Sequence, residues 1–411
     1  MSVARDEALR ADAADPLRAL RHRFVLPPGR IYLLGNSLGA LPVAAPAAFD
    51  RVVREEWGAQ LIDGWNAGWY DAPVVLGDRV ARLIGASPGE VVVADTTSNN
   101  LMKVVHAALT IGRRTGRGVV GYDAGMFPTD IYVAESVAAA TGASAVALTF
   151  TDGALPADLS PQLAAVVISH VDYRTGRLLD MGAISTQLHA RGILAIWDLS
   201  HSAGAVPVAL DASDVDYAVG CTYKYLNAGP GAPAFVFVRE RLLADTVVLP
   251  AGWFAHREPF AMAAEFVAAD DIRRMLVGTP PVIASTGLAA SLDIFDDVDL
   301  RELRAKSLAL SDLFVETLAV ARAPVQIVTP PPAAHRGAQI SLRHASAYPV
   351  VRNLAARGVI GDFREPDIMR FGFAALYTRY VDAYDAATAL VDVLASESFR
   401  DPAYAERTRV T

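Results

Sequence analysis

The sequence has very little cysteine and no concentration of positive charge. Only Cys221 among the 411 residues is a cysteine, which excludes an internal disulfide and a metal site built from cysteines. Lysine and arginine form no run and the net charge is −8, so we expect no nucleic-acid partner. No stretch reaches the ~18 apolar residues of a membrane helix, and residues 1–20 carry charges instead of an apolar leader. We therefore expect a cytoplasmic protein without a membrane partner and without a metal.

Apolar residues are abundant, at 53% of the chain. A chain of this length and composition buries a large core and divides into more than one domain. Between about residues 85 and 240, short apolar runs alternate with segments of helical spacing. This alternation predicts an α/β fold, in which helices flank a mostly parallel sheet on both faces. The runs expected to form strands are EVVVAD, GVVGYD, AVALTF, AAVVISHV, ILAIWDLS, YAVGCTYK and GAPAFVFV.

The pattern changes after about residue 290. A long helical pattern covers residues 300–320, a proline-rich break follows, and shorter strand and helix patterns continue to the end. These features predict a smaller α+β domain beside the large one. The expected division is an N-terminal segment (1–45) that packs with the small domain and the functional site, a large domain (46–290) and a small C-terminal domain (291–411).

Chemical groups in a parallel sheet gather at the carboxyl ends of its strands. One apolar run ends at Asp198, and His201 follows three residues later. Asp198 alone fits a carboxylate that caps a turn. Lys224 stands between two tyrosines after another apolar run. It fits either a surface lysine or a Schiff-base lysine whose amine is activated by desolvation.

Two further strand ends carry polar or aromatic groups. Thr96, Thr97 and Ser98 precede a helical pattern. They fit an ordinary helix cap, or a phosphate cup made of hydroxyls and free helix N–H groups. Phe127 and Asp130 occur in YDAGMFPTDIYV, which by itself fits a turn.

These four pieces together match the needs of one cofactor, pyridoxal phosphate. The cofactor requires an amine for its aldehyde, a carboxylate that keeps its ring nitrogen protonated, a phosphate cup and a group that stacks on its ring. Lys224, Asp198, Thr96 with Thr97, and Phe127 supply these groups in that order. The sequence therefore predicts a binding site for pyridoxal phosphate.

Seven stretches resemble the kynureninase family of pyridoxal-phosphate-dependent hydrolases. They follow the family's order from residue 32 to residue 377. The resemblance implies the PLP-dependent transferase fold of type I, as in aspartate aminotransferase. It implies cleavage of the Cβ–Cγ bond of L-kynurenine by water, giving anthranilate and L-alanine in tryptophan catabolism. The stretches are YLLGNSLG, FPTD, DLSHSAG, YKYLNAGPG, GWFAH, GTPP and RFGFAALY.

The resemblance also implies roles for single residues. Lys224 would bind the cofactor and move the Cα proton, and Asp198 would pair with the pyridine nitrogen. Tyr223 would contact the phosphate and donate a proton, and these three are the predicted catalytic residues. The other predicted cofactor contacts are Thr96, Thr97, Phe127, Pro128, Thr129, Asp130, Ser169, His201 and, from the partner subunit of a homodimer, Trp253 and Thr279.

A substrate site follows from the same resemblance. Arg370 matches the arginine that holds the substrate α-carboxylate, which a planar guanidinium grips with two hydrogen bonds. Trp65 matches members that prefer kynurenine to its 3-hydroxy form, because an apolar tryptophan offers less to a ring hydroxyl than a histidine does. The predicted substrate contacts are Asn36 and Ser37 of the loop GNSLG, Trp65, Gly278 and Arg370.

Other functions remain open at this point. A cysteine desulfurase or β-lyase would share Asp198 and Lys224, but a desulfurase needs a mobile cysteine and Cys221 lies on a predicted strand. A non-catalytic protein of the same fold would be expected to lack one of the two shared residues. A nicotinamide enzyme would need G-x-G-x-x-G after the first strand of the sheet, and EVVVADTTSNN does not contain it.

Overall fold

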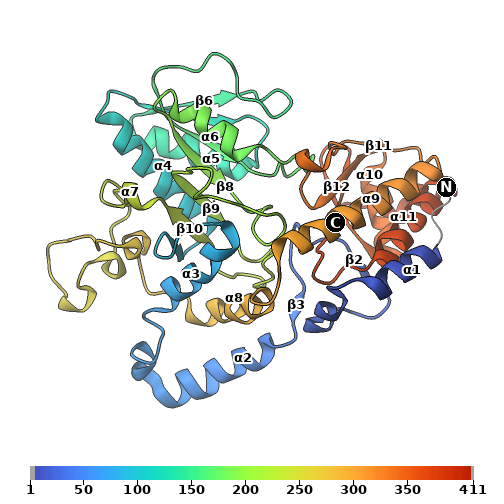
Figure 1. Cartoon of the computed structure of the whole chain (residues 1–411), viewed down its shortest axis with the longest axis horizontal. Coiled ribbons are helices and arrows are strands. Elements are labelled where there is room, and N and C mark those ends of the chain that lie inside the picture. Colours follow the sequence, from blue (N-terminus) through green and yellow to red (C-terminus); the bar gives the residue numbers. More distant parts are fainter. Residues whose placement is uncertain (1–4, 409–411) are drawn as a thin grey trace.

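The computed structural model describes residues 5–408, which form two parts of unequal size (Figure 1). The larger part is built on a seven-stranded sheet and the smaller part on a four-stranded sheet. The long helix α9 (Leu300–Val320) leads from the larger part into the smaller one. Within the described residues, no helix combines the length and the apolar character that crossing a membrane requires.

The large sheet confirms the seven strands expected from the apolar runs. Its spatial order is β4-β10-β9-β8-β7-β5-β6. Only β10 runs against its neighbours, so the sheet is mostly parallel, as predicted. Its strands are β4 (Val91–Val93), β5 (Val119–Asp123), β6 (Ser144–Leu148), β7 (Leu163–Ser169), β8 (Leu194–Asp198), β9 (Tyr217–Gly220) and β10 (Phe235–Val238).

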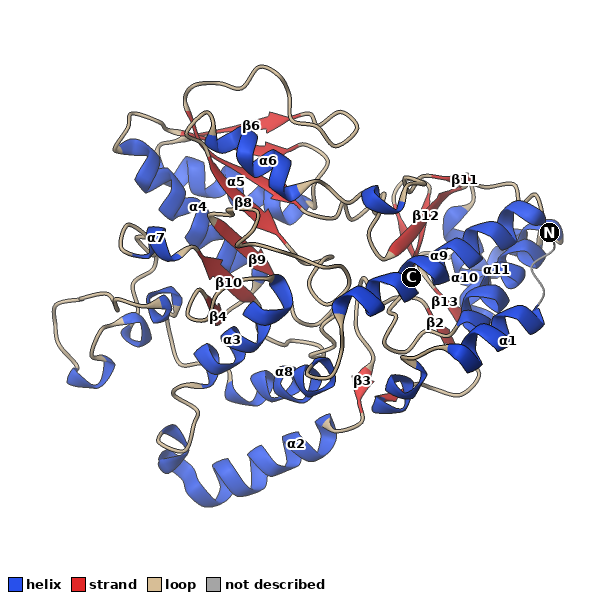
Figure 2. Ribbon diagram, in the orientation of Figure 1, coloured by secondary structure: helices blue, strands red, loops and turns tan. Residues whose placement is uncertain are grey.

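Helices flank this sheet on both faces (Figure 2). Along β7, Val166 and Ile168 join one hydrophobic core while Ala165 and Val167 join another. Successive side chains of a strand point to opposite faces, so each face of the sheet is covered. The helices of this part are α2 (Ala45–Arg51), α3 (Ala72–Ile84), α4 (Thr97–Arg113), α5 (Pro128–Thr141), α6 (Met181–His189), α7 (Glu240–Leu243) and α8 (Val282–Phe295).

The small sheet is antiparallel and has one apolar and one polar face. Ile340 and Phe371 lie on the apolar face, where the Phe371 ring centre is 5.1 Å from that of Phe314 on α9. Arg370 lies on the polar face and contacts the larger part. The elements are β11 (Gln326–Ile327), β12 (Gln339–Arg343), β14 (Asp362–Arg364) and β15 (Ile368–Gly372), packed with α9, α10 (Ala347–Ala356) and α11 (Tyr380–Ala395).

The N-terminal segment runs along the smaller part and returns to the larger one. α1 (Arg5–Ala14) packs against α11. β2 (Ile31–Tyr32) pairs in parallel with β13 (Val359–Ile360), and β1 (Phe24–Val25) pairs with β3 (Leu41–Pro42). The loop between β2 and β3 therefore lies where the two parts meet.

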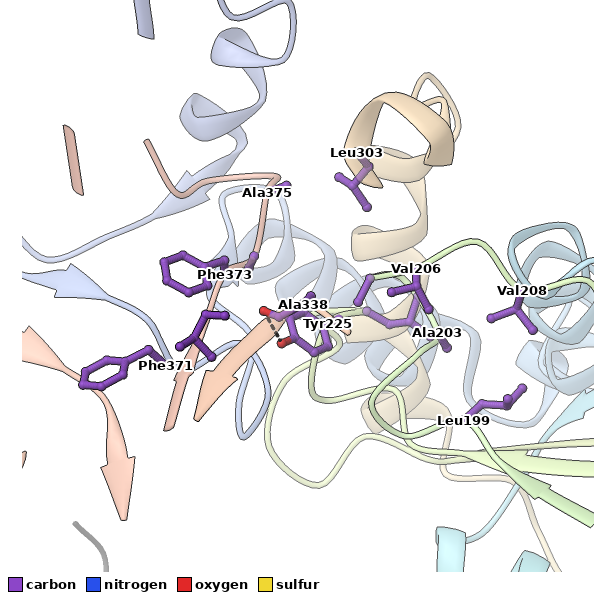
Figure 3. Close-up of a cluster of buried hydrophobic side chains, with 14 of the residues drawn as sticks. Leu199, Ala203, Val206, Val208, Tyr225, Leu303, Ala338, Phe371, Phe373 and Ala375 are labelled. Atoms are coloured by element: carbon purple, nitrogen blue, oxygen red, sulfur yellow. Dashed lines mark hydrogen bonds between the residues drawn. The ribbon is translucent and has the colours of Figure 1, made fainter. Parts of the chain in front are cut away.

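Buried apolar side chains join the two parts into one core (Figure 3). Leu199 and Tyr225 come from the larger part, Ala338 from the smaller part and Leu303 from α9. The Tyr225 hydroxyl donates a hydrogen bond of 3.2 Å to the Ala338 carbonyl oxygen. Since Tyr225 directly follows Lys224, this core holds the lysine loop in place.

Candidate active site

A cavity of about 350 Å³ lies at the carboxyl ends of the parallel strands. This volume is in the usual range of small-molecule sites. The ends of β7 and β8, the loop after β9 and the beginnings of α4 and α5 form its large-sheet wall. β14 and β15 form its small-sheet wall. The predicted site residues that line the cavity are Asn36, Ser37, Thr97, Phe127, Thr129, Asp130, Ser169, Asp198, His201, Tyr223, Lys224 and Arg370.

Two predicted cofactor contacts belong instead to helix starts beside the cavity. The Thr96 hydroxyl accepts a hydrogen bond of 3.2 Å from the Asn99 N–H and so caps α4. Pro128 is the first residue of α5, a position that suits proline because the missing N–H is not needed there. Neither residue lines the cavity.

Four further predicted residues lie away from the cavity in their own chain. Trp65 and Trp253 both contact Phe254, with ring centres 5.9 and 4.9 Å apart. Gly278 and Thr279 are exposed in the segment before α8. None of the four lines the cavity of its own chain.

Lys224 differs from the other lysines in its surroundings. The chain has three lysines, and Lys103 and Lys306 each form an ion pair with an aspartate. Between residues 5 and 408, no carboxylate forms an ion pair with Lys224, whose amine lies 5.8 Å from the centre of the Tyr223 ring. An amine without a fixed counterion is available to react with an aldehyde.

Two buried carboxyl groups, Asp130 and Asp198, line the cavity beside this lysine. Asp198 Oδ1 also accepts hydrogen bonds from the Ser200 N–H at 2.9 Å and from the Ser200 hydroxyl at 2.6 Å. Burial raises the pKa of Asp130 well above its usual range, and the negative charge of Asp198 raises it further. Asp130 therefore keeps its proton to higher pH than an ordinary carboxyl group does. The Asp198 carboxyl group lines the cavity, where it is placed to pair with a protonated ring nitrogen.

An aromatic ring and a neutral imidazole also line the cavity. Phe127 meets Tyr173 edge to face, with the ring centres 5.3 Å apart. Burial, followed by the positive charges of Lys224 and Arg370, lowers the pKa of His201 well below its usual range. His201 is therefore uncharged and offers a hydrogen bond or a flat ring to a ligand.

The beginning of α4 provides a site for an anion. Thr97 and Ser98 are the first two residues of this 17-residue helix, and both line the cavity. The first N–H groups of a helix have no partner within the helix and carry a partial positive charge. Thr97 and Ser98 are therefore placed to border the predicted phosphate cup, while the Thr96 hydroxyl caps the same helix.

Tyr223 and Cys221 lie close together behind the lysine loop. Burial raises the pKa of the Tyr223 phenol above its usual range, and the Cys221 thiol raises it further, so the phenol keeps its proton at neutral pH. Cys221 is buried, and its Sγ lies 3.8 Å from the Ser200 carbonyl oxygen. A thiol enclosed in this way does not suit the mobile cysteine of a desulfurase.

Arg370 is held in one orientation on the small-sheet wall. Its Nε and Nη2 donate to the two oxygens of Asp362 at 2.8 and 2.5 Å, and its Nη1 donates to the Tyr173 carbonyl at 2.6 Å. Nη2 also lies 3.3 Å from Ser37 Oγ. The sequence analysis did not predict Asp362. The signal that points to it is the aspartate of the short stretch GDFRE, which precedes the strand that carries Arg370.

The glycine-rich loop 35–39 is wedged between the lysine loop and the arginine strand. The Gly39 N–H donates a hydrogen bond of 2.8 Å to the lysine loop, and a Cβ on Gly39 would come within 2.4 Å of the Lys224 carbonyl oxygen. On the other side, a Cβ on Gly372 would come within 2.4 Å of Asn36 Oδ1. Both contacts need the close backbone approach that only glycine allows, so this loop is more than a plain turn.

These groups fit pyridoxal phosphate. Lys224, Asp198, Phe127 and the start of α4 offer the amine, the carboxylate, the stacking ring and the phosphate site around one cavity. Among residues 5–408, Asp130 Oδ2 and His201 Nδ1 are buried without a hydrogen-bond partner. Buried polar atoms are normally paired, so these two are suited to a ligand in the cavity.

Comparison with known proteins agrees with this geometry. A family described as the kynureninase C-terminal domain matches residues 303–390. Curated kynureninases from Burkholderia pseudomallei (strain 1106a) and Pseudomonas fluorescens are each 46% identical to this chain, over 99% of both chains. A solved cysteine desulfurase from Escherichia coli gives a TM-score of 0.77 at 20% identity, covering 93% of this chain and 98% of its own. A cystine C–S lyase with its product, cysteine persulfide, gives 0.75 at 18% identity, covering 90% and 98%.

The mostly parallel sheet, with a lysine and an aspartate at its strand ends, defines a pyridoxal-phosphate-dependent enzyme of fold type I. Within that class, both curated relatives named above are kynureninases. The chain belongs to the kynureninase family, hydrolases that act on carbon–carbon bonds. The fold class, the family and the cofactor predicted from the sequence are thereby confirmed.

Proposed function

We propose that this chain hydrolyses L-kynurenine to anthranilate and L-alanine. One observation carries the proposal. A lysine amine, a buried aspartate and a buried arginine (Lys224, Asp198 and Arg370) line one cavity, in a chain 46% identical to kynureninases over 99% of its length.

The large-sheet wall would hold the cofactor. Lys224 would bind its aldehyde, Asp198 its ring nitrogen, the start of α4 its phosphate, and Phe127 one face of its ring. When bound, the cofactor supplies a protonated ring that draws electrons from the substrate carbon beside the amine. Asp198 would keep that ring nitrogen protonated, since a carboxylate stabilises the positive charge of the ring.

The protein's side chains would orient the substrate and move its protons. Arg370 and Ser37 bind the α-carboxylate, which directs the Cα–H bond toward the Lys224 amine that removes this proton. Water adds to the γ-carbonyl, and its oxygen leaves in the carboxylate of anthranilate when the Cβ–Cγ bond breaks. Tyr223 then protonates Cβ, which completes L-alanine, because its phenol still carries a proton at neutral pH.

We also infer a homodimer in which each subunit completes the other's site. The predicted residues Trp65, Trp253, Gly278 and Thr279 do not line the cavity of their own chain. A second, mostly apolar cavity of about 730 Å³ lies between α2 and the start of α8, and the exposed Trp57 contributes to it. Apolar surface of this extent favours a protein partner. A second copy is the occupant that would also supply the four residues.

Light scattering tests the assembly. The expected result is twice the chain mass of 43.7 kDa. A fully active monomer would contradict the shared site. The cytoplasmic location and the division into residues 1–45, 46–290 and 291–411 stay predictions.

Release of fluorescent anthranilate tests the reaction. Purified protein with pyridoxal phosphate and L-kynurenine should release it, and Lys224→Ala should not. An inactive wild-type protein that still shows the cofactor absorption band would refute the proposal. With 3-hydroxykynurenine the wild type should show a lower kcat/KM. If Trp65 contacts the substrate ring, Trp65→His should reduce the difference in kcat/KM between the two substrates by a few-fold, on the order of 1 kcal/mol.

A further inference from the structure

Three charged side chains share one face of the small sheet at the cavity. Asp362 on β14 lies directly opposite Arg370 on β15 in the antiparallel register. Arg364 follows Asp362 by two positions on β14, and residues two apart on a strand point to the same side. Arg364 and Arg370 both line the cavity.

Asp362 is the shared partner of both arginines. Its Oδ2 lies 2.5 Å from Arg370 Nη2 and 3.0 Å from Arg364 Nη2, and it accepts a hydrogen bond of 2.8 Å from the Ser37 hydroxyl. Its Oδ1 accepts from Arg370 Nε at 2.8 Å. One edge of the Arg370 guanidinium is thus already committed to a carboxylate of the protein.

This arrangement matters for the charge that a substrate meets. Arg370 and Asp362 together carry no net charge, so by themselves they attract an incoming carboxylate weakly. Arg364 adds one positive charge, and the trio becomes a net cation. His201, which also lines the cavity, does not supply that charge, because its pKa is lowered well below its usual range.

Arg364 is also placed to touch a ligand. About a third of its side chain is exposed (34%), against 2% for Arg370. In the described part of the chain, Arg364 forms an ion pair with Asp362, and its Nη1 donates a hydrogen bond of 2.7 Å to the Phe363 carbonyl oxygen. A guanidinium has five N–H donors in a planar fork, so donors remain that can face the cavity.

We infer that Arg364 is a second anchor for the substrate α-carboxylate and restores the positive charge that Asp362 removes from Arg370. The inference rests on the proposed function, in which Arg370 binds that carboxylate. It assigns a binding role to Arg364 and a positioning role to Asp362, which holds both arginines on the same side of the cavity.

The test is the affinity of the cofactor-loaded protein for L-alanine, followed by the change in cofactor absorption. Arg364→Gln should weaken L-alanine binding about 10- to 100-fold, as expected for the loss of a charge-assisted hydrogen bond. Arg364→Lys, which keeps the charge, should weaken it by a few-fold. L-Alaninamide has the same shape without the negative charge, so its binding should not change in Arg364→Gln.

The matched control is Arg343→Gln. Arg343 lies on β12 of the same sheet and pairs with Asp367 at 3.2 Å, but it does not line the cavity. Its replacement should leave both affinities unchanged. A second pair of variants starts from Asp362→Asn, so that removal of Arg364 leaves no carboxylate at position 362 without its partner. Asp362→Asn should bind L-alanine about 10-fold more tightly than Asp362→Asn combined with Arg364→Gln, even if Arg364→Gln alone does not fold.

Each outcome separates the inference from the proposed function. Wild-type affinity for L-alanine in Arg364→Gln overturns the inference. An equal loss of affinity for L-alanine and for L-alaninamide overturns it as well. In turnover of kynurenine, a raised KM with a kcat within a few-fold of wild type supports it. A wild-type protein that binds L-alanine through Arg364 but releases no anthranilate would refute the proposed reaction and leave the carboxylate site standing.

Discussion

The two walls of the cavity place their chemical groups in different ways. On the large-sheet wall, Ser169 and Asp198 are the last residues of the neighbouring parallel strands β7 and β8 and lie side by side. On the small-sheet wall, Asp362 and Arg370 are paired across two antiparallel strands. The first arrangement needs only parallel strands that end at one edge. The second needs two strands in the correct register, since a slip of one residue would turn these side chains to the other face.

The walls also differ in how they treat protons. On the large-sheet wall, burial raises the pKa of Asp130 and lowers the pKa of His201, so it favours the uncharged form of both groups. On the small-sheet wall, burial acts to raise the pKa of Asp362, but the hydrogen bonds and charges of Arg370 and Arg364 outweigh it, and the pKa falls below its usual range. The large-sheet wall therefore handles protons, whereas the small-sheet wall holds fixed charges that orient a substrate.

The largest expected effect comes from breaking the large-sheet wall at its lysine. Lys224→Ala should lower kcat for anthranilate release by at least about 10⁴-fold, because it removes both the amine that binds the cofactor and the base that moves the Cα proton. The measurement is single-turnover fluorescence with the cofactor in excess. Residual turnover within about 100-fold of wild type would show that another group moves the proton.

Breaking the small-sheet wall should instead raise KM. Arg370→Gln is expected to raise KM by about 100-fold with a smaller change in kcat, and to cost about 3–5 kcal/mol of stability by leaving Asp362 buried without its main partner. Kinetics and urea unfolding measure the two effects. Adding Asp362→Asn should recover stability but not KM. A fall in kcat alone would contradict the division of work between the walls.

The loop that touches both walls offers a sharper comparison. A Cβ on Gly39 would meet the Lys224 carbonyl oxygen at 2.4 Å, so Gly39→Ala should cost about 1–3 kcal/mol of stability through forced backbone shifts. It should also lower kcat/KM about 10-fold, because the lysine moves relative to the arginine. The control is Gly118→Ala, where a Cβ would meet nothing within 4 Å. Equal effects of both substitutions would contradict the close packing of the loop at residues 35–39 against the lysine loop.

The smallest expected effect is a change in how the stability of the cofactor-free protein depends on pH. Burial raises the pKa of Asp130 in the folded state, so the folded state keeps this proton to higher pH than the unfolded chain does. The resulting stability is complete below the ordinary carboxyl pKa and is lost as pH rises toward the raised value.

Asp130→Asn should remove this loss, because asparagine does not ionise. Thermal unfolding should show the variant gaining roughly 2–4 °C on the wild type at pH 8 compared with pH 4. A constant difference between the two proteins at all pH values would show that Asp130 is not protonated in the fold. Bound pyridoxal phosphate would change the neighbourhood of Asp198, so the comparison uses protein without it.

Sequence patterns predicted the large-sheet wall better than the small-sheet wall. The seven apolar runs became the seven strands, and the helical pattern over residues 300–320 became α9 with the same limits. The short strand β14 was missed, because three residues are too few to show an alternation. Asp362 and Arg364 were missed with it. Trp65 and Trp253 lie outside the cavity of their own chain. For Trp253 the family resemblance implied this placement, because it assigned Trp253 to the partner subunit, whereas Trp65 was predicted as a substrate contact without that assignment.

By itself, the sequence determined which residues end the parallel strands. Runs such as AAVVIS and ILAIWD are buried on both faces of the sheet, so Ser169 and Asp198 had to emerge at its edge. Only the tertiary structure decided what faces them. The loop at residues 35–39 precedes Asp362 and Arg370 by more than 300 residues in the sequence. Only the packed core around Tyr225 and the register of β14 and β15 bring these groups together.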